Sequence, residues 1–322
     1  MIYYGYEVSP LFIDGESIKW KLAGCTEYIF GKKSGKNFFI KRTLHVHYPD
    51  RSLPESIYKM YKAEADKLAD KQAKLSTLMA SIRESDRIVK EEDHFWDSEN
   101  MYVTVTKLIP EALPDDYNFT VISEKAYIGL VLDFAERLKI LHSCGVIHGD
   151  LMEKNVLITT DGKNYKTHLI GFEQSYAATD IPEWDCIAGT DGYQSPELLL
   201  YVFDEGAAEP GTITTATDIF TMALIMHRWW TGAFPTSDLD AGASVGAAVY
   251  LEKNISIDKK FDITIGANCG ATLMSLMNWM LTKDPAKRPT AEQVVAVLTD
   301  KSAVSTEYHK GSDKKPFDAA SC

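Results

Sequence analysis

The sequence predicts an α+β fold of two lobes, a small strand-rich lobe followed by a larger helical lobe. Three observations support this prediction. Residues 17–42 alternate between apolar and polar side chains, as strands do. Residues 55–82 form one long stretch with apolar side chains at helical spacing, and the pattern stays helical from residue 216 to 300.

Strands joined by tight turns, and one long helix, are expected in the first lobe. Residues 32–36 (Lys-Lys-Ser-Gly-Lys) have the composition of a turn, and residues 37–42 form an apolar strand that ends in two basic residues. A proline and a glutamate open the helix of residues 55–82. Two further strands are predicted at residues 87–95 and 100–109.

Helices dominate the second lobe. Residues 110–118 have the composition of a linker, and Ile128, Phe134 and Leu141 mark an amphipathic helix after it. Later helices are predicted at residues 217–230, 271–281 and 291–298. The expected organisation is a strand-rich lobe with its long helix at residues 1–109, a helical lobe at 110–303 and a polar tail at 304–322.

Composition narrows the class of protein. The chain has 322 residues, of which 45% are hydrophobic, and a net charge of -12, which disfavours nucleic acid as a partner. Its most apolar helical run, residues 219–230, is too short to cross a bilayer, and the first five residues do not resemble a signal peptide. Five scattered cysteines lack metal-ligand spacing. We therefore expect reduced thiols and a cytoplasmic protein that does not engage membranes.

The stretch His148–Ile158 carries the clearest chemistry. Asp150 can orient a hydroxyl group and accept its proton, and Lys154 can neutralise a migrating phosphoryl group. The side-chain oxygen of Asn155 can bind a divalent cation. Phosphoryl transfer requires these three kinds of group close together, because its catalysis is mostly positioning and charge neutralisation.

The chain resembles the protein-kinase superfamily over about residues 15–300. His148–Asn155 matches the catalytic-loop pattern H-R-D-L-x-x-x-N, with glycine in place of the arginine. Gly189–Glu197 is similar to the G-T-x-x-Y-x-[A/S]-P-E end of an activation segment, and its threonine indicates a serine/threonine architecture. Asp218 matches the aspartate that ties down the catalytic loop. Arg288 matches the arginine that pairs with Glu197, and we expect these two to form a buried ion pair.

The resemblance implies catalytic roles for several residues. Lys41 looks like the third-strand lysine that binds the nucleotide phosphates, and Asp150 like the catalytic aspartate. Lys154 stands where tyrosine kinases carry an arginine that replaces the lysine lost at Met152. Glu64 is the preferred helix partner of Lys41. Asp66, Asp70 and the absence of any partner remain alternatives.

The resemblance also implies that ATP binds between the two lobes. Gly24 is the one glycine kept in a degraded glycine-rich turn. Val105 is expected at the back of the nucleotide pocket, with the backbone of Thr106 and Leu108 near the adenine. Asn155 is the expected metal ligand.

Three departures from the family pattern affect function. Gly171 stands where the metal-binding aspartate of D-F-G belongs, so Mg²⁺ binding is expected to be weak or absent. Glu173 is a possible substitute ligand. Gly149 removes the arginine that usually contacts a phosphorylated activation segment, which disfavours that mode of activation.

Three functions follow from these features. The preferred one is a serine/threonine kinase-like domain with impaired transfer to protein hydroxyls, either a weak kinase or a pseudokinase that docks a regulatory protein. An active kinase with Glu173 as a shifted metal ligand is the first alternative. The second is a small-molecule phosphotransferase similar to aminoglycoside and choline kinases, because these carry H-G-D-x-x-x-x-N and a later D-[FW]-E. His148–Asp150 and Phe172-Glu173 resemble that pattern.

Overall fold

The protein was analysed as a computed structural model, which describes residues 1–23, 26–184, 187, 189–203, 210–239, 242–265 and 271–299. The chain divides into two compact units. Unit 1 contains residues 1–80 and 89–111, and unit 2 contains residues 81–88 and the described residues from 112 onward. The expected polar tail at 304–322 lies outside the described residues.

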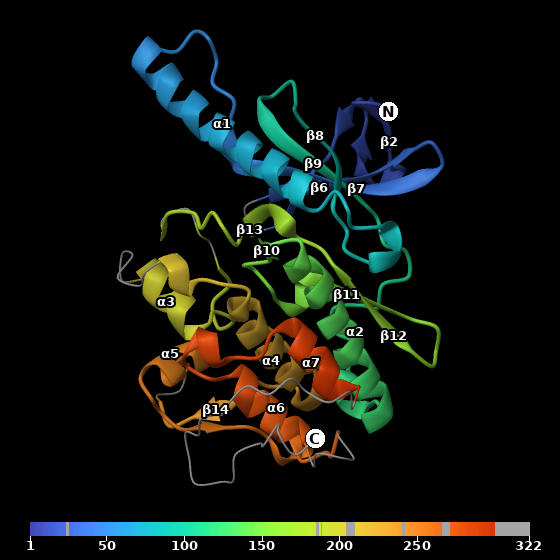
Figure 1. Cartoon of the computed structure of the whole chain (residues 1–322). Helices are drawn as coiled ribbons and strands as arrows, with labels where there is room; N and C mark the ends of the chain where they lie inside the picture. The colour runs from blue at the N-terminus through green and yellow to red at the C-terminus, as the bar shows by residue number, and fades with distance from the viewer. Residues whose placement is uncertain are drawn as a thin grey trace. The chain divides into compact units, whose positions relative to one another are not determined.

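An antiparallel sheet forms the centre of unit 1 (Figure 1). Its strands follow the order β1-β2-β6-β7-β9-β8, and β5 also pairs with β6. Their bounds are Ile2–Tyr3 (β1), Tyr6–Val8 (β2), Lys21–Ala23 (β5), Thr26–Lys33 (β6), Lys36–His47 (β7), Glu91–Trp96 (β8) and Met101–Lys107 (β9). A small hairpin of β3 (Ile13–Asp14) and β4 (Ser17–Ile18) lies outside this sheet.

The first 20 residues supply part of the core of unit 1. Tyr6, Val8 and Phe12 are buried against one face of the sheet, together with Ile29 and Ile40. Each fully buried apolar side chain of this size contributes about 1.5–3 kcal/mol relative to an exposed one. The alternating pattern predicts strands only from residue 17 onward, so it does not reveal this contribution.

Helix α1 (Glu55–Leu78) is the long helix expected in the first lobe. It packs against β7 through the face that contains Tyr58, Ala65, Gln72 and Leu75. The helix ends four residues before the predicted end at Ile82, and a 3-10 turn follows at Glu84–Asp86.

Strand β8 begins four residues later than predicted. The reason lies in the backbone of Arg87, which is left-handed (φ 54°) and therefore cannot continue a strand. Ile88 instead forms an isolated parallel bridge with Leu169, so residues 81–88 pack within unit 2.

Unit 2 is built around two buried helices, α2 (Glu124–Ser143) and α4 (Ala216–Thr231). In α2, Leu130, Phe134, Leu138 and Leu141 are fully buried at helical spacing. Helix α4 is buried almost throughout and ends at Gly232, whose left-handed backbone caps it. The other helices are α3 (Pro196–Phe203), α5 (Val245–Tyr250), α6 (Leu273–Met280) and α7 (Ala291–Leu298).

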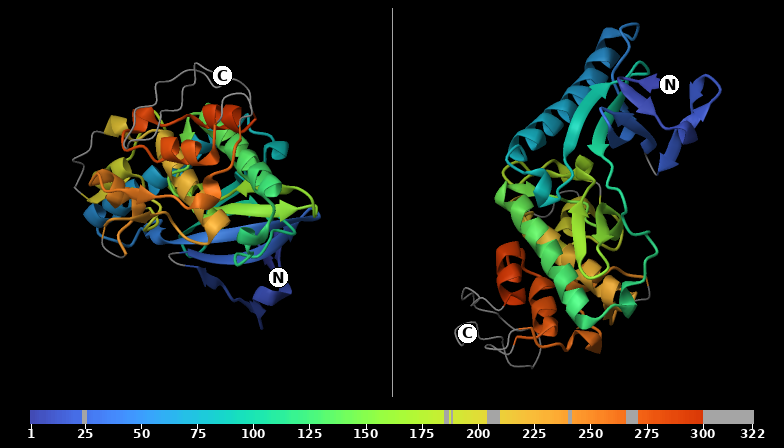
Figure 2. Two further views of the ribbon diagram at one scale, coloured as in Figure 1. Left: turned by 90° about the horizontal axis from the view of Figure 1, so that it is seen from below. Right: turned by 90° about the vertical axis from the view of Figure 1, so that its right-hand side faces the viewer.

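Short strand pairs position the loops of unit 2. Strand β10 (Val146–Ile147) pairs with β13 (Tyr176–Ala177), β11 (Val156–Thr160) with β12 (Tyr165–Leu169), and β14 (Thr236–Ser237) with β15 (Ile255–Ser256). Figure 2 shows the β11–β12 hairpin beside α2, with which β12 makes contact. The catalytic-loop residues lie between β10 and β11, and Gly171 follows β12.

Candidate active site

The loop after β10 is anchored by Asp218 in the first turn of α4. One carboxylate oxygen accepts the amide of His148 at 2.8 Å, and the other accepts the amide of Gly149 at 3.1 Å. The His142 Nε2 lies 2.9 Å from the first of these oxygens. Burial opposes ionisation of Asp218, but His142 and the amides outweigh it and lower the pKa of the carboxyl. The role expected for Asp218 is therefore confirmed.

Asp150, Asn155 and Thr190 meet at one point. The Thr190 hydroxyl donates to Asp150 Oδ1 at 2.7 Å. Asn155 Nδ2 donates to the backbone oxygen of Asp150 at 2.7 Å and to its Oδ2 at 3.2 Å. Asp150 is half-buried. Asn155 holds its carboxylate in place while that carboxylate contacts the Thr190 hydroxyl. This geometry suits a carboxylate that accepts a hydroxyl proton.

Lys154 is exposed, on the 3-10 turn Glu153–Asn155 that closes the loop. Among the described residues, no hydrogen bond or ion pair joins Lys154 to Asp150. Met152 contacts the Thr190 hydroxyl through its sulfur at 3.5 Å. The structure therefore brings Asp150 and Asn155 together but leaves Lys154 at the edge of the group.

Gly171 adopts a left-handed backbone, with φ 80° and ψ 50°. A Cβ atom on this glycine would lie 2.7 Å from Asn155 Oδ1, so the amide of Asn155 fills the space beside it. The next residue, Phe172, is buried against the His148 ring, with centroids 5.0 Å apart. Position 171 therefore offers no side-chain oxygen to a metal.

Gly149 has a packing reason to be glycine. Its φ is 76°, and an added Cβ would lie 2.8 Å from Tyr176 Cε1 and 3.1 Å from the Gln174 carbonyl oxygen. From the sequence, Gly149 was interpreted only as a replacement for the arginine of H-R-D. The structure adds that Tyr176 of β13 leaves no room for a side chain.

Glu197 and Arg288 form the buried ion pair that the sequence predicts. Arg288 donates from Nη1 to Glu197 Oε1 at 2.7 Å and from Nη2 to Oε2 at 2.6 Å. The two side chains are only 0% and 6% exposed. The pair joins α3 to the segment that precedes α7.

A family model described as "Protein kinase domain" matches residues 56–297, about three quarters of the chain. The chain belongs to the protein kinase family. Its two-unit α+β architecture, with a strand-rich sheet and a helical part, agrees with this assignment.

The curated relatives are mostly serine/threonine kinases. The chain is 28% identical to calcium/calmodulin-dependent protein kinase type II of Caenorhabditis briggsae over 54% of this chain and 30% of that protein. It is 27% identical to serine/threonine-protein kinase stk11 of Xenopus laevis over 56% of this chain and 37% of that protein. A probable serine/threonine-protein kinase vps15 of Dictyostelium discoideum is 23% identical over 83% of this chain and 14% of that protein. The chain thus spans well under half of these relatives.

Position 171 of this chain lacks the side-chain carboxylate of the magnesium site that kinases use. Kinases bind Mg²⁺ with ATP through a carboxylate at the position of Gly171 and through the asparagine that corresponds to Asn155. Glu173 is half-exposed in the turn after Gly171 and is the nearest acidic residue in sequence.

A cavity of about 520 Å³ lies beside the catalytic loop, entirely within unit 2. Arg228 of α4 forms an ion pair with Glu153 at 2.5 Å, and Glu153 also accepts a hydrogen bond from the Tyr193 hydroxyl. No sequence pattern links Arg228, Glu153 and Tyr193, because these residues are far apart in the chain. The lining consists of residues 113–120, 152–154, 156–158, Tyr193, Arg228, Trp229 and Gly232.

In unit 1, Lys41 and Glu64 lie on different elements. Lys41 is half-buried on β7, opposite Tyr28 of β6 and Thr104 of β9. Glu64 is exposed on α1, whereas Gln72 is the polar residue on the buried face of that helix.

The position expected for Val105 needs correction. Val105 pairs with Ile40, and both side chains are buried in the core on one face of the sheet. Because side chains alternate along a strand, Lys41 points to the other face, and the side chain beside it is that of Thr104.

Two further residues expected near the adenine, Thr106 and Leu108, lie at the end of β9 and directly after it. Thr106 pairs with Phe39 on β7. The amide of Leu108 donates to the Asn37 carbonyl at 3.0 Å, so it is already engaged within the sheet. Gly24 lies outside the described residues.

No helix among the described residues is long and apolar enough to span a membrane.

Proposed function

We propose that this chain is a serine/threonine-type kinase domain that binds ATP with little help from Mg²⁺. Transfer to protein hydroxyls is slow or absent, so the domain acts as a weak kinase or as a pseudokinase that docks a regulatory protein. The observation that carries this proposal is Gly171, which places no ligand where the family has its metal-binding carboxylate.

Loss of this carboxylate affects catalysis more than folding. A divalent ion contributes several kcal/mol of charge stabilisation to the transition state of phosphoryl transfer. Asn155 supplies one neutral oxygen, and its amide nitrogen is already bonded to Asp150. A single neutral ligand holds Mg²⁺ poorly, since this ion favours carboxylates and phosphates.

The rest of the machinery supports descent from an active kinase. Asp150 still contacts a hydroxyl group, and Asp218 still anchors the loop. The Glu197–Arg288 pair supports a protein kinase over a small-molecule phosphotransferase, because the activation segment that it anchors is a peptide-docking feature which the latter enzymes lack.

A thermal-shift titration with ATP, with and without MgCl₂, tests the binding part of the proposal. A ligand at a hundredfold excess over its Kd stabilises the fold by about 2.7 kcal/mol. We expect ATP to raise the melting temperature equally with and without Mg²⁺. A shift that appears only with Mg²⁺ would contradict the proposal.

Gly171→Asp tests the metal ligand directly, with Gly171→Asn as its matched control. Both side chains tolerate a left-handed backbone, and both must displace the Asn155 amide, so they differ mainly in charge. We expect Mg²⁺-dependent ATP binding and faster autophosphorylation only in the aspartate variant. Each 1.36 kcal/mol regained in the transition state corresponds to about tenfold in rate. The gain should disappear when Asp150→Asn is added.

The variant Glu173→Gln distinguishes the proposed function from its main alternative, an active kinase in which Glu173 binds the metal. If the unmodified chain phosphorylates itself at an ordinary kinase rate and Glu173→Gln abolishes this activity, Glu173 is the metal ligand. The domain is then an active kinase, and the proposal is wrong.

A further inference from the structure

Arg87 has a backbone conformation that arginine rarely adopts. Its φ is 54° and its ψ is 36°, in the left-handed region. This conformation is energetically unfavourable for a residue with a Cβ atom. It persists only where surrounding contacts determine it, and such residues often lie near functional sites.

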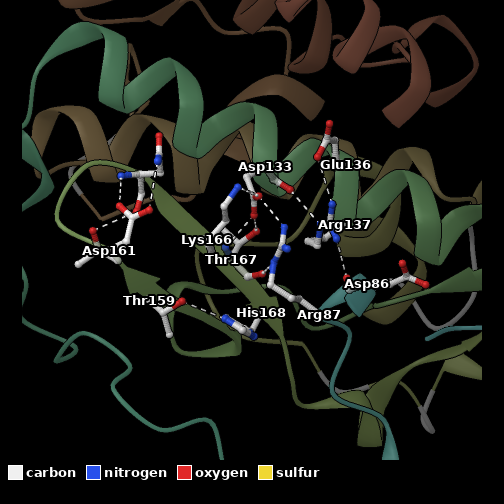
Figure 3. A network of polar contacts seen from close by, with 12 residues as sticks. Asp86, Arg87, Asp133, Glu136, Arg137, Thr159, Asp161, Lys166, Thr167 and His168 are labelled. Carbon is white, nitrogen blue, oxygen red and sulfur yellow. Dashed lines mark hydrogen bonds and ion pairs between the residues drawn. The ribbon is translucent and has the colours of Figure 1, made fainter. Parts of the chain in front are cut away.

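The contacts of Arg87 converge on one buried carboxylate (Figure 3). Its Nη2 donates to Asp133 Oδ1 at 2.6 Å, and its Nε donates to the Thr167 carbonyl at 3.2 Å. Asp133 is 5% exposed and also accepts the amide and the hydroxyl of Thr167, each at 2.8 Å. Lys166 Nζ lies 3.4 Å from the same carboxylate. We call Arg87, Asp133, Lys166 and Thr167 the Asp133 cluster.

The backbone at Arg87 is joined to the end of β12. The Arg87 carbonyl accepts the amide of Leu169 at 3.0 Å, and Ile88 bridges Leu169 in parallel. The Arg87 side chain and main chain therefore hold two points of β12, at Thr167 and at Leu169.

The turn that carries Gly171 begins at the next residue. The amide of Ile170 donates to the Asn155 carbonyl at 3.0 Å, and its carbonyl lies 2.9 Å from His148 Nε2. Arg87 thus contacts Leu169 and the catalytic loop contacts Ile170, and these two residues immediately precede Gly171. Losing the Arg87 contact would leave the turn held only by Ile170 and by the pairing of Leu169 with Val156, and so loosen its position relative to Asn155.

We propose that Arg87 is a positioning residue, which through the Asp133 cluster holds the Leu169–Gly171 turn in register with Asn155 and Asp150. Residues 81–88 follow α1 directly in the chain, since that helix ends at Leu78.

Hydrogen exchange tests the contact without a nucleotide and so independently of the proposed function. Arg87→Gly keeps the left-handed backbone at low cost but removes the guanidinium. We expect the amides of Leu169 and Ile170 to exchange at least about tenfold faster in Arg87→Gly and in Asp133→Asn. The double variant should add little further, because both changes break one network.

Thr290→Ala is the matched structural control. It removes the N-cap of α7, which destabilises that helix, and does not touch the Asp133 cluster. Exchange at Leu169 should not change there. If Arg87→Gly stabilises the fold and leaves exchange at Leu169 unchanged, Arg87 merely occupies a strained turn, and the inference is overturned.

A second measurement addresses function in the Gly171→Asp background, and it rests on the proposed function. Adding Arg87→Gly should weaken the Mg²⁺-dependent part of ATP binding about tenfold and leave the metal-free part unchanged. Adding Thr290→Ala should change neither. An equal loss with and without Mg²⁺ would contradict a positioning role. If Gly171→Asp creates no metal dependence at all, the proposed function fails, and the exchange experiment still decides the role of Arg87.

Discussion

Gly149, which precedes Asp150, and Gly171, which lies beside Asn155, both adopt left-handed backbones. Each would bring a Cβ atom within 2.8 Å of a neighbour, Tyr176 in the first case and Asn155 in the second. The neighbours differ in kind, because Tyr176 is a buried ring whereas Asn155 ends in a movable amide. A side chain is therefore harder to introduce at position 149 than at position 171.

Gly149→Ala should destabilise the protein by more than backbone strain alone. Gly145→Ala is the control, since Gly145 has a similar φ of 72° but no atom within 4 Å of an added Cβ. Strain accounts for about 1–2 kcal/mol in both variants. Overpacking against Tyr176 should add about 1–3 kcal/mol only in Gly149→Ala. Urea unfolding measures both, and equal losses would show that Tyr176 moves aside freely.

His168 should make stability depend on pH. Burial, and then the charge of Arg87, lowers the pKa of His168 to about 4, whereas an unfolded histidine titrates near pH 6.5. Between these values the unfolded state binds more protons, so stability falls as pH drops from about 6.5 to about 4. Asp133 opposes this shift, and Arg137 adds to it.

The variant His168→Gln removes this titration and retains a polar group near Thr159, whose hydroxyl lies 3.1 Å from the His168 ring. We expect its melting temperature to fall less than that of the wild type between pH 7 and pH 4.5. Parallel curves for the two proteins would mean that His168 titrates normally.

At the scale of secondary-structure elements, buried charged side chains bond loops to helices. Asp218 of α4 holds the catalytic loop by two amides, and Arg288 holds Glu197 of α3. A buried charge is tolerated only when it is paired and hydrogen-bonded. Each of these anchors therefore fixes a loop at one position relative to the helical core.

Arg288→Ala should lower the free energy of unfolding by about 3–5 kcal/mol, because it leaves Glu197 buried without its partner. Lys139→Ala is a suitable control, since it breaks an ion pair with Glu292 in which the side chains are 44% and 73% exposed. Such exposed pairs contribute at most about 1 kcal/mol. Guanidinium denaturation compares the two, and similar losses would indicate that solvent reaches the Glu197–Arg288 pair.

At the scale of the molecule, each of the two units has its own buried apolar residues. Strands β1 and β2 belong to the sheet of unit 1, and Tyr6 and Val8 pack with Phe12 in its core, yet the family match begins only at residue 56. Unit 2 contains α2 and α4, whose apolar faces are almost completely buried. The net charge of -12 lies entirely on unit 2, because unit 1 has 15 basic and 15 acidic residues.

Lys41→Met tests whether the whole chain keeps a kinase-like nucleotide site. We expect ATP to stabilise the wild type but to stabilise Lys41→Met much less, because the phosphate charge loses its partner. Lys36→Met, at the exposed start of β7, is the control and should respond to ATP like the wild type. The measurement is the ATP-induced rise in melting temperature, and an undiminished rise in Lys41→Met would show that Lys41 does not bind the nucleotide.

Long, strongly patterned elements were predicted closely. The helix at 291–298 matches α7, and the helix predicted at 217–230 differs from α4 by one residue at each end. The prediction failed where tertiary contacts override local pattern. Residues 87–90 look like a strand, but Arg87 turns away because Asp133 and Leu169 hold it in unit 2.

The order of motifs along the chain was sufficient to indicate a kinase, with Asp150, Asn155, Asp218 and the Glu197–Arg288 pair. These residue types at these spacings are local properties of a sequence, so they can be recognised before any fold is known. Which side chains meet is not local. The pairing register of β7 and β9 places Thr104 beside Lys41, and packing against Tyr176 requires glycine at position 149. Contacts between residues far apart in the chain exist only after folding, and they explain why Arg87 holds the Gly171 turn.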